Sequence, residues 1–278
     1  MVLWDGSRHD WLEGRGPWLT LVGAIDDATS ELLPGAHFVS QECTAGYLRL
    51  LREIVREKGI PLSIYMDRHG SLCLHEKGGR RSTLEQELEG TRGLTQVGRA
   101  LQELAIEPIY ALSPQAKGRV ERVWGTLQDR LTSELRLAKV SDIEGANELL
   151  RKFLRPHNQR FAIGAAESTP AWRKVPEGLS LDLVCAMRYD ALVRNDNAIK
   201  IGPVVLDIPP GPKRRSYAKA VVNAAQLLDG SWRIFYKGEL IARAPKTTTM
   251  ELRISSVGYR RWVGRKPPPS HVYEAYGA

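Results

Sequence analysis

Three acidic residues of this chain have the types and positions that metal-assisted phosphoryl transfer requires. Asp5 follows the apolar run Val2–Trp4, and Asp67 follows the apolar run 60–66, so both are predicted at the ends of buried strands. A carboxylate in such a place costs desolvation unless hydrogen bonds or a metal compensate it. Glu121 lies on a predicted helix. Oxygen ligands of this kind suit Mg²⁺ or Mn²⁺, and two ions about 3.5–4 Å apart can activate an attacking oxygen and stabilise a leaving one.

The element that carries Glu121 is predicted from the residues around it. Ser113 is predicted to cap a helix and Pro114 to be its first residue. A stripe of apolar residues follows at helical spacing: Val120, Trp124, Leu127, Leu131 and Leu135. Cations surround Glu121, and a carboxylate among cations can hold a metal close to phosphates. A solvated, salt-bridged helix face would give the same pattern. The alternatives to metal binding for the two aspartates are that Asp5 caps the end of a strand and that Asp67 forms a turn.

Four segments in a fixed order resemble the motifs of ISNCY-type insertion-sequence transposases, within the DDE transposases and retroviral integrases. They are residues 5–16 (DGSRHDWLEGRG), 25–30 (IDDATS), 65–69 (YMDRH) and 113–121 (SPQAKGRVE). The resemblance extends from residue 1 to roughly residue 245. It implies a ribonuclease H-like core in which Asp5, Asp67 and Glu121 are the catalytic residues and the ligands of two Mg²⁺ (or Mn²⁺) ions.

The resemblance also implies the reaction and the partners. The reaction is cleavage and strand transfer of DNA in transposition, by a homo-oligomer on transposon ends and target, in the bacterial cytoplasm at the nucleoid. The family carries a helix-turn-helix region upstream, and Asp5 stands near the start of this sequence, so we expect an N-terminally truncated copy. Two alternatives remain open: a non-catalytic DNA-binding remnant, and a ribonuclease H-like nuclease without strand transfer. The nuclease would favour a fourth carboxylate, for which the weak candidates are Asp10, Glu13, Asp26 and Asp27.

Composition favours a polyanionic partner. The chain has 40 Lys and Arg against 32 Asp and Glu, a formal net charge of +8. Two basic groups are candidates for DNA binding, although the second is as often a solvated loop: Gln115, Lys117, Arg119 and Arg122 at the helix start, and Lys213, Arg214 and Arg215. No apolar run approaches the roughly 20 residues of a membrane span, and no signal peptide is predicted. Three scattered cysteines indicate free thiols rather than disulfides or a zinc site.

The predicted fold class is α/β, a ribonuclease H-like mixed sheet flanked by helices and followed by a small all-β barrel. Strands are predicted at 18–25, 32–39, 61–66 and 108–112, with helices at 42–58, 97–104 and 142–154 besides the Glu121 helix. The helical pattern is predicted to break at Pro156. Six short β-like runs between residues 189 and 242 predict the barrel. We therefore expect a core at 1–160, a connector at 161–186, a barrel at 187–245 and a basic, flexible tail at 246–278.

Overall fold

The computed structural model describes residues 1–67, 95–110, 118–167, 169, 171–211 and 214–252. The chain divides into two compact units, residues 1–175 and 176–278. The predicted helix cap at Ser113 and Pro114 and most of the tail predicted at 246–278 lie outside the described ranges.

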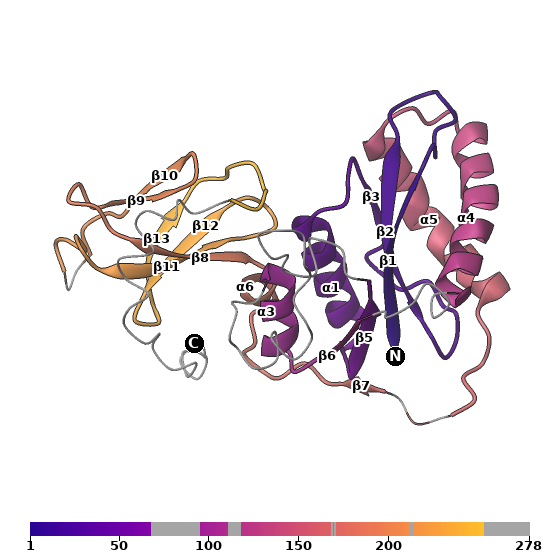
Figure 1. Ribbon diagram of the computed structural model, residues 1–278, viewed down its shortest axis with the longest axis horizontal. Helices are drawn as coiled ribbons and strands as arrows, with labels where there is room; N and C mark the ends of the chain where they lie inside the picture. Colours follow the sequence, from indigo (N-terminus) through magenta and orange to yellow (C-terminus); the bar gives the residue numbers. More distant parts are fainter. Residues whose placement is uncertain (68–94, 111–117, 168, 170, 212–213, 253–278) are drawn as a thin grey trace, which may run out of the picture. The chain divides into compact units, whose positions relative to one another are not determined.

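A five-stranded mixed sheet forms the centre of the first unit (Figure 1). Its spatial order is β3 (His37–Val39), β2 (Leu19–Asp26), β1 (Val2–His9), β5 (Ser63–Met66) and β6 (Glu107–Tyr110). The first three strands are antiparallel neighbours, whereas β1–β5 and β5–β6 are parallel. This is the arrangement of a ribonuclease H-like sheet, so the predicted fold class of the core is confirmed.

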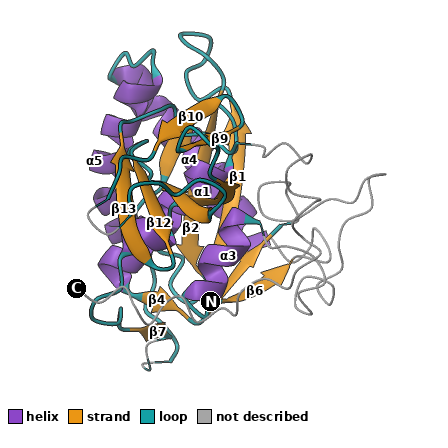
Figure 2. Ribbon diagram, turned by 90° about the vertical axis from the view of Figure 1, so that its left-hand side faces the viewer, coloured by secondary structure: helices purple, strands orange, loops and turns teal. Residues whose placement is uncertain are grey.

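Helices cover both faces of this sheet (Figures 1 and 2). Alternate side chains of β1 point to opposite faces. Trp4 stacks on Tyr47 of α1 (Thr44–Lys58), with ring centroids 5.7 Å apart. Leu3 instead packs into the core beneath α4 (Gly118–Leu137) and α5 (Ile143–Phe161). The helix α3 (Gln96–Glu103) contacts α1. All five residues of the apolar stripe predicted for α4 are buried in the α4–α5 core.

Helix α5 runs through Pro156, so the predicted break at this residue is wrong. Proline removes one backbone donor and typically costs about 3 kcal/mol in a helix interior. Contacts on both sides of Pro156 offset that cost. The Asn147 side-chain amide exchanges hydrogen bonds of 2.7 and 3.1 Å with the backbone of Phe38. The Asn158 side-chain amide likewise exchanges two hydrogen bonds of 2.9 Å with the backbone of Leu32. These bonds hold the last turns of α5 to the segment between β2 and β3.

Three strand boundaries also differ from the predictions. The strand β1 does not end at Asp5 but continues to His9, because residues 2–9 pair with residues 19–26 without interruption. The strand predicted at 32–39 forms only at its end, since Gly35 turns the chain with φ +88°. The strand predicted at 61–66 is divided into β4 (Ile60–Pro61), which pairs with β7 (Trp172–Arg173), and β5.

The second unit is built from antiparallel strands. One sheet has the order β13 (Glu239–Ala244), β12 (Trp232–Tyr236), β11 (Val221–Gln226) and β8 (Met187–Leu192). A separate hairpin joins β9 (Ala198–Ile201) to β10 (Val204–Asp207). A short helix, α6 (Leu181–Val184), precedes them. The six predicted strands are therefore present, arranged as two antiparallel sheets in the described residues.

Candidate active site

Asp5 and Asp67 hold matching places relative to two neighbouring parallel strands. The last parallel pair between β1 and β5 joins Leu3 to Tyr65, and both of these side chains contact the α4–α5 core. Asp5 lies two residues after Leu3 on β1, and Asp67, the first residue after β5, lies two residues after Tyr65. Because side chains two positions apart on a strand share a face, Asp5 is directed to the α4 side of the sheet. The backbone register therefore places two of the three predicted site residues at the same level along the sheet.

Trp124 of α4 holds Asp5 in place. Its indole Nε1 donates a hydrogen bond of 2.8 Å to Oδ2 of Asp5. The ring can approach the sheet because the residue paired with Asp5 on β2 is Gly23. A Cβ at Gly23 would lie 2.8 Å from the Trp124 ring. One turn later on the same helix face, Gln128 donates a hydrogen bond of 3.0 Å to Ser7 Oγ. Helix α4 is thus fixed against β1 by two polar contacts.

Glu121 lies one turn before Trp124 on the face of α4 that approaches the sheet. Residues three apart on a helix are neighbours on its surface. The contacts of Trp124 with Asp5 and of Gln128 with Ser7 show that the helix runs in the same direction as β1. Glu121 therefore lies on the Val2 side of Asp5, where Arg122 and Val123 line one cavity with Met1 and Val2. Its side chain is exposed, and Asp5 is half-buried.

The donor chemistry fits a hard divalent cation, since every candidate ligand is a carboxylate oxygen. Asp5 and Asp67 each lie two residues beyond the last parallel pair of β1 and β5. Within the residues that the structure describes, however, no group of three or more His, Cys, Asp or Glu side chains is close enough to hold a metal ion. The expected convergence of three carboxylates is thus not present in this conformation. The assignment of Asp5, Asp67 and Glu121 as ligands stays a prediction.

A fourth acid, Glu42, is brought to this end of the sheet by tertiary structure. It precedes α1 and accepts a short hydrogen bond from the Tyr47 hydroxyl. Its Oε2 lies 2.9 Å from where a Cβ at Gly6 would stand, next to Asp5. Burial raises the pKa of the Tyr47 phenol well above its usual value, and the negative charges of Glu42, Asp67 and Asp5 raise it further. The negative charges of these three carboxylates therefore all oppose ionisation of the same buried hydroxyl.

Sequence reasoning did not single out Glu42. The only available signal was its position directly before a helix that follows the third strand. Three of the four weak candidates for a fourth acid have other roles. Asp26 Oδ1 and Asp10 Oδ1 each accept a backbone hydrogen bond that closes a turn. Glu13 forms ion pairs of 2.8 Å with Arg15 and 2.7 Å with Arg136, which attach the β1–β2 loop to the end of α4.

Known proteins were compared with the chain by sequence and by structure. No family model matches it. It is 38% identical over 188 residues to the putative transposase y4bF of Sinorhizobium fredii, which covers 66% of this chain and 39% of that protein. It is 31% identical over 201 residues to the transposase for insertion sequence IS1202 of Streptococcus pneumoniae, covering 72% of this chain and 40% of that protein.

The chain is related to insertion-sequence transposases. It spans about two fifths of the length of the curated relatives that it matches, 39% and 40%. Among solved structures, a chain of the simian T-cell lymphotropic virus intasome covers 91% of this chain and 78% of its own length, with 14% sequence identity and a TM-score of 0.43. A likeness of that size carries no argument about function.

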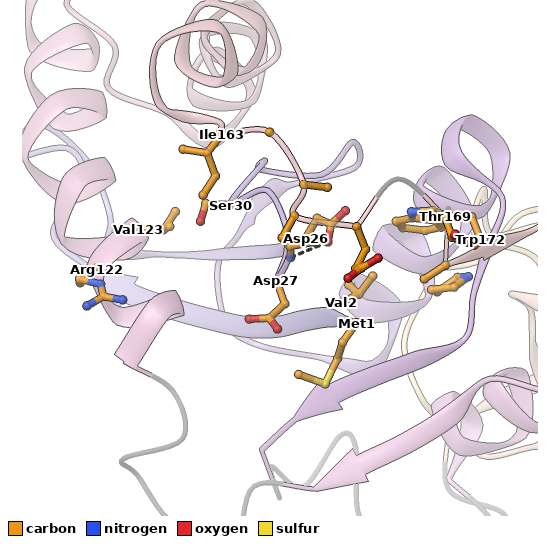
Figure 3. Close-up of a pocket in the computed structure, with 17 residues that line it drawn as sticks. Met1, Val2, Asp26, Asp27, Ser30, Arg122, Val123, Ile163, Thr169 and Trp172 are labelled. Atoms are coloured by element: carbon orange, nitrogen blue, oxygen red, sulfur yellow. Dashed lines mark hydrogen bonds between the residues drawn. The ribbon is translucent and has the colours of Figure 1, made fainter.

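A cavity of about 870 Å³ lies beside the first turns of α4 in the transposase-related core (Figure 3). Arg122 and Val123, the two residues after Glu121, line its α4 side. The turn with Asp26 and Asp27 lines it as well, together with the segment after α5 and the first residues of β1. The cavity therefore joins the neighbourhood of Glu121 to the β2–β3 turn that the transposase resemblance had singled out.

The basic residues predicted to bind DNA are only partly described. Gln115, Lys117 and Lys213 lie outside the described residues, as does the side chain of Arg119. Arg122 and Arg215 are exposed. Arg214 stacks over two rings of the second unit, Tyr217 at 5.3 Å and Tyr236 at 5.1 Å. Lys237 lies over the Tyr236 ring as well, at 5.6 Å.

No helix among the described residues is long and apolar enough to cross a membrane.

Proposed function

We propose that the first unit is the catalytic core of a DDE-type transposase that cleaves DNA and transfers the cut strand. The observation that carries the proposal is the matched position of Asp5 and Asp67 on parallel strands, with α4 anchored to Asp5 through Trp124. The relatives, which are named as insertion-sequence transposases, supply the reaction class. The finer assignment to ISNCY-type elements rests on the four sequence motifs.

In this proposal Asp5, Asp67 and Glu121 hold Mg²⁺ or Mn²⁺. When bound, such ions supply Lewis-acid activation of an attacking oxygen and stabilisation of the leaving one. The hydrogen bond from Trp124 orients the Asp5 carboxylate. Glu121, in the exposed first turn of α4, would supply the third carboxylate of the set. No side chain of the protein serves as a nucleophile.

DNA would be held by phosphate contacts on both units. Arg122 supplies one beside Glu121. On the second unit, Arg214 lies over the rings of Tyr217 and Tyr236, and Lys237 lies over that of Tyr236. Both cations are exposed and can contact phosphates. A homo-oligomer on paired transposon ends, with activity at the bacterial nucleoid, belongs to the same proposal.

The decisive experiment compares Asp67→Asn with wild type in two assays. Cleavage of a labelled duplex in Mg²⁺ or Mn²⁺ should be abolished, while DNA affinity should change little because the Lys and Arg contacts remain. Without DNA, Mn²⁺ should raise the melting temperature of wild type more than that of Asp67→Asn, because a ligand of the folded state stabilises it. Glu144→Gln, an exposed acid in the first turn of α5, is the matched control. Cleavage by Asp67→Asn at the wild-type rate would exclude Asp67 as a ligand.

A second function is that of a DNA-binding relative that retains the fold without catalysis. The cations that lie over aromatic rings of the second unit would serve DNA binding without any metal. In that case wild type and Asp67→Asn would bind DNA equally, neither would cleave it, and Mn²⁺ would shift neither melting temperature.

A further inference from the structure

A groove of about 630 Å³ runs between α4 and α5, and the proposed active site does not use it. The two helices lie side by side in Figure 1, and side chains of both line the groove. Its volume is in the range of sites for small organic ligands. Its lining combines aromatic rings, two guanidinium groups, two carboxylates and the ammonium group of Lys152, which is paired with Glu148. A ligand of this groove must suit the rings, the guanidinium groups and the carboxylates together.

The aromatic part is a row of rings on α5. Phe153, His157 and Phe161 follow one another at the spacing of one helical turn, with centroid distances of 5.4 and 4.9 Å. His157 is only 5% exposed. Burial, with a further contribution from Arg130, lowers the pKa of its imidazole. The ring therefore adds a flat neutral surface at neutral pH rather than a further cation.

The guanidinium groups of the groove belong to two arginines that both lie over the ring of Phe161. Arg130 of α4 lies 4.8 Å and Arg160 of α5 lies 5.6 Å from the centroid of Phe161. Among the described residues, neither guanidinium forms an ion pair. Two like charges near a single ring repel one another, and an anion bound between them would offset that repulsion. Planar guanidinium groups match the geometry of phosphate and carboxylate oxygens.

The two carboxylates distinguish between the possible anions. Asp129 and Glu134 of α4 also line the groove. An acidic peptide would bring several negative charges toward them and be repelled. Each nucleotide carries a single charge on its phosphate, and the N–H groups of its base can donate hydrogen bonds to such carboxylates. The rings on α5 offer the surface on which a base can stack.

We propose that the α4–α5 groove binds one nucleotide of a single DNA strand, with its phosphate on Arg130 and Arg160 and its base against Phe153 and Phe161. A base can reach these rings only when it is unstacked from a duplex. Arg130 lies about 13.5 Å along the helix axis from Glu121, on the opposite face of α4. The groove is therefore separate from the proposed active site. This inference rests on the proposed action on DNA, but not on catalysis.

The test measures binding of a labelled short oligothymidylate and of a duplex in EDTA, so that failure of metal-dependent cleavage leaves it unaffected. Arg130→Gln and Arg160→Gln should each weaken single-strand binding about tenfold, the usual effect of a lost charge-assisted contact. Each should reduce the salt slope by about 0.7. Duplex binding should change much less. The control is Arg155→Gln, which removes the same charge from an exposed position of α5 outside the groove lining.

Photocrosslinking gives a second readout that does not depend on variants being folded. An oligonucleotide with 5-iododeoxyuridine should crosslink to the α5 segment 149–161 of the wild-type chain. The proposal is overturned if the crosslinks fall only on the second unit. It is also overturned if Arg130→Gln and Arg160→Gln, with wild-type melting temperatures, bind the single strand as Arg155→Gln does. Capture of an acidic peptide in place of the oligonucleotide would equally refute it.

Discussion

Substitution of Gly23 by alanine should disturb the proposed active site without altering any of its charged groups. The new Cβ would stand 2.8 Å from Cη2 of Trp124 and 3.5 Å from the Cβ of Ala36. Carbon atoms in favourable contact are about 3.5–4.0 Å apart, so the indole must move by about 0.7 Å or more. Its hydrogen bond to Asp5, now 2.8 Å, would then reach or pass the limit of a useful bond.

The expected loss of stability follows from two terms. Overpacking of this kind costs about 1–3 kcal/mol, and a weakened hydrogen bond to a charged acceptor costs about 1.5 kcal/mol more. Replacement of glycine within a strand returns about 0.5–1 kcal/mol. We expect a net destabilisation of about 2–3 kcal/mol, which lowers the melting temperature by about 5–10 °C in a unit of this size. DNA cleavage should fall at least tenfold at a temperature where the variant is folded.

Two further variants make the result specific. Gly125→Ala, on an open part of α4 where a Cβ meets nothing within 4 Å, should stabilise the helix by about 1 kcal/mol and leave cleavage unchanged. Trp124→Phe in the Gly23→Ala background relieves the clash, but phenylalanine has no N–H group that could donate a hydrogen bond to Asp5. It should therefore recover part of the melting temperature and none of the activity. A Gly23→Ala protein that melts and cleaves as wild type would refute the role assigned to Trp124.

Two more predictions concern pH and salt. Burial lowers the pKa of His37 from 6.5 to about 4, so the unfolded chain binds more protons between these values. Stability should be complete above about pH 6.5 and fall by about 3 kcal/mol as the pH approaches 4; a His37→Gln melting profile that keeps this dependence would contradict the assignment. DNA binding by the chain should be weak, with little sequence preference and a log–log salt slope of about −0.9 for each phosphate contact. Titrations against terminal-repeat and scrambled duplexes would measure this, and a preference for the repeat at high salt would contradict it.

The sequence alone determined the elements whose patterns are local. The stripe from Val120 to Leu135 repeats at helical spacing, and all of it is buried in α4. Asp67 comes directly after a short apolar run, and β5 ends at Met66. The strands of the second unit alternate with turn residues, so their positions agree closely with the prediction. Each of these features depends on residues within a few positions of one another, which is the range over which periodicity and turn chemistry act.

Only the tertiary structure decided what depends on distant partners. The strand β1 passes through Asp5 because β2 pairs with all of it. Helix α5 passes through Pro156 because Asn158 binds the backbone of Leu32, which lies 126 positions away in the chain. The contact of Trp124 with Asp5 spans 119 positions. No local pattern encodes which indole meets which carboxylate, since that choice follows from the packing of α4 on the sheet and from the space left by a glycine on the neighbouring strand.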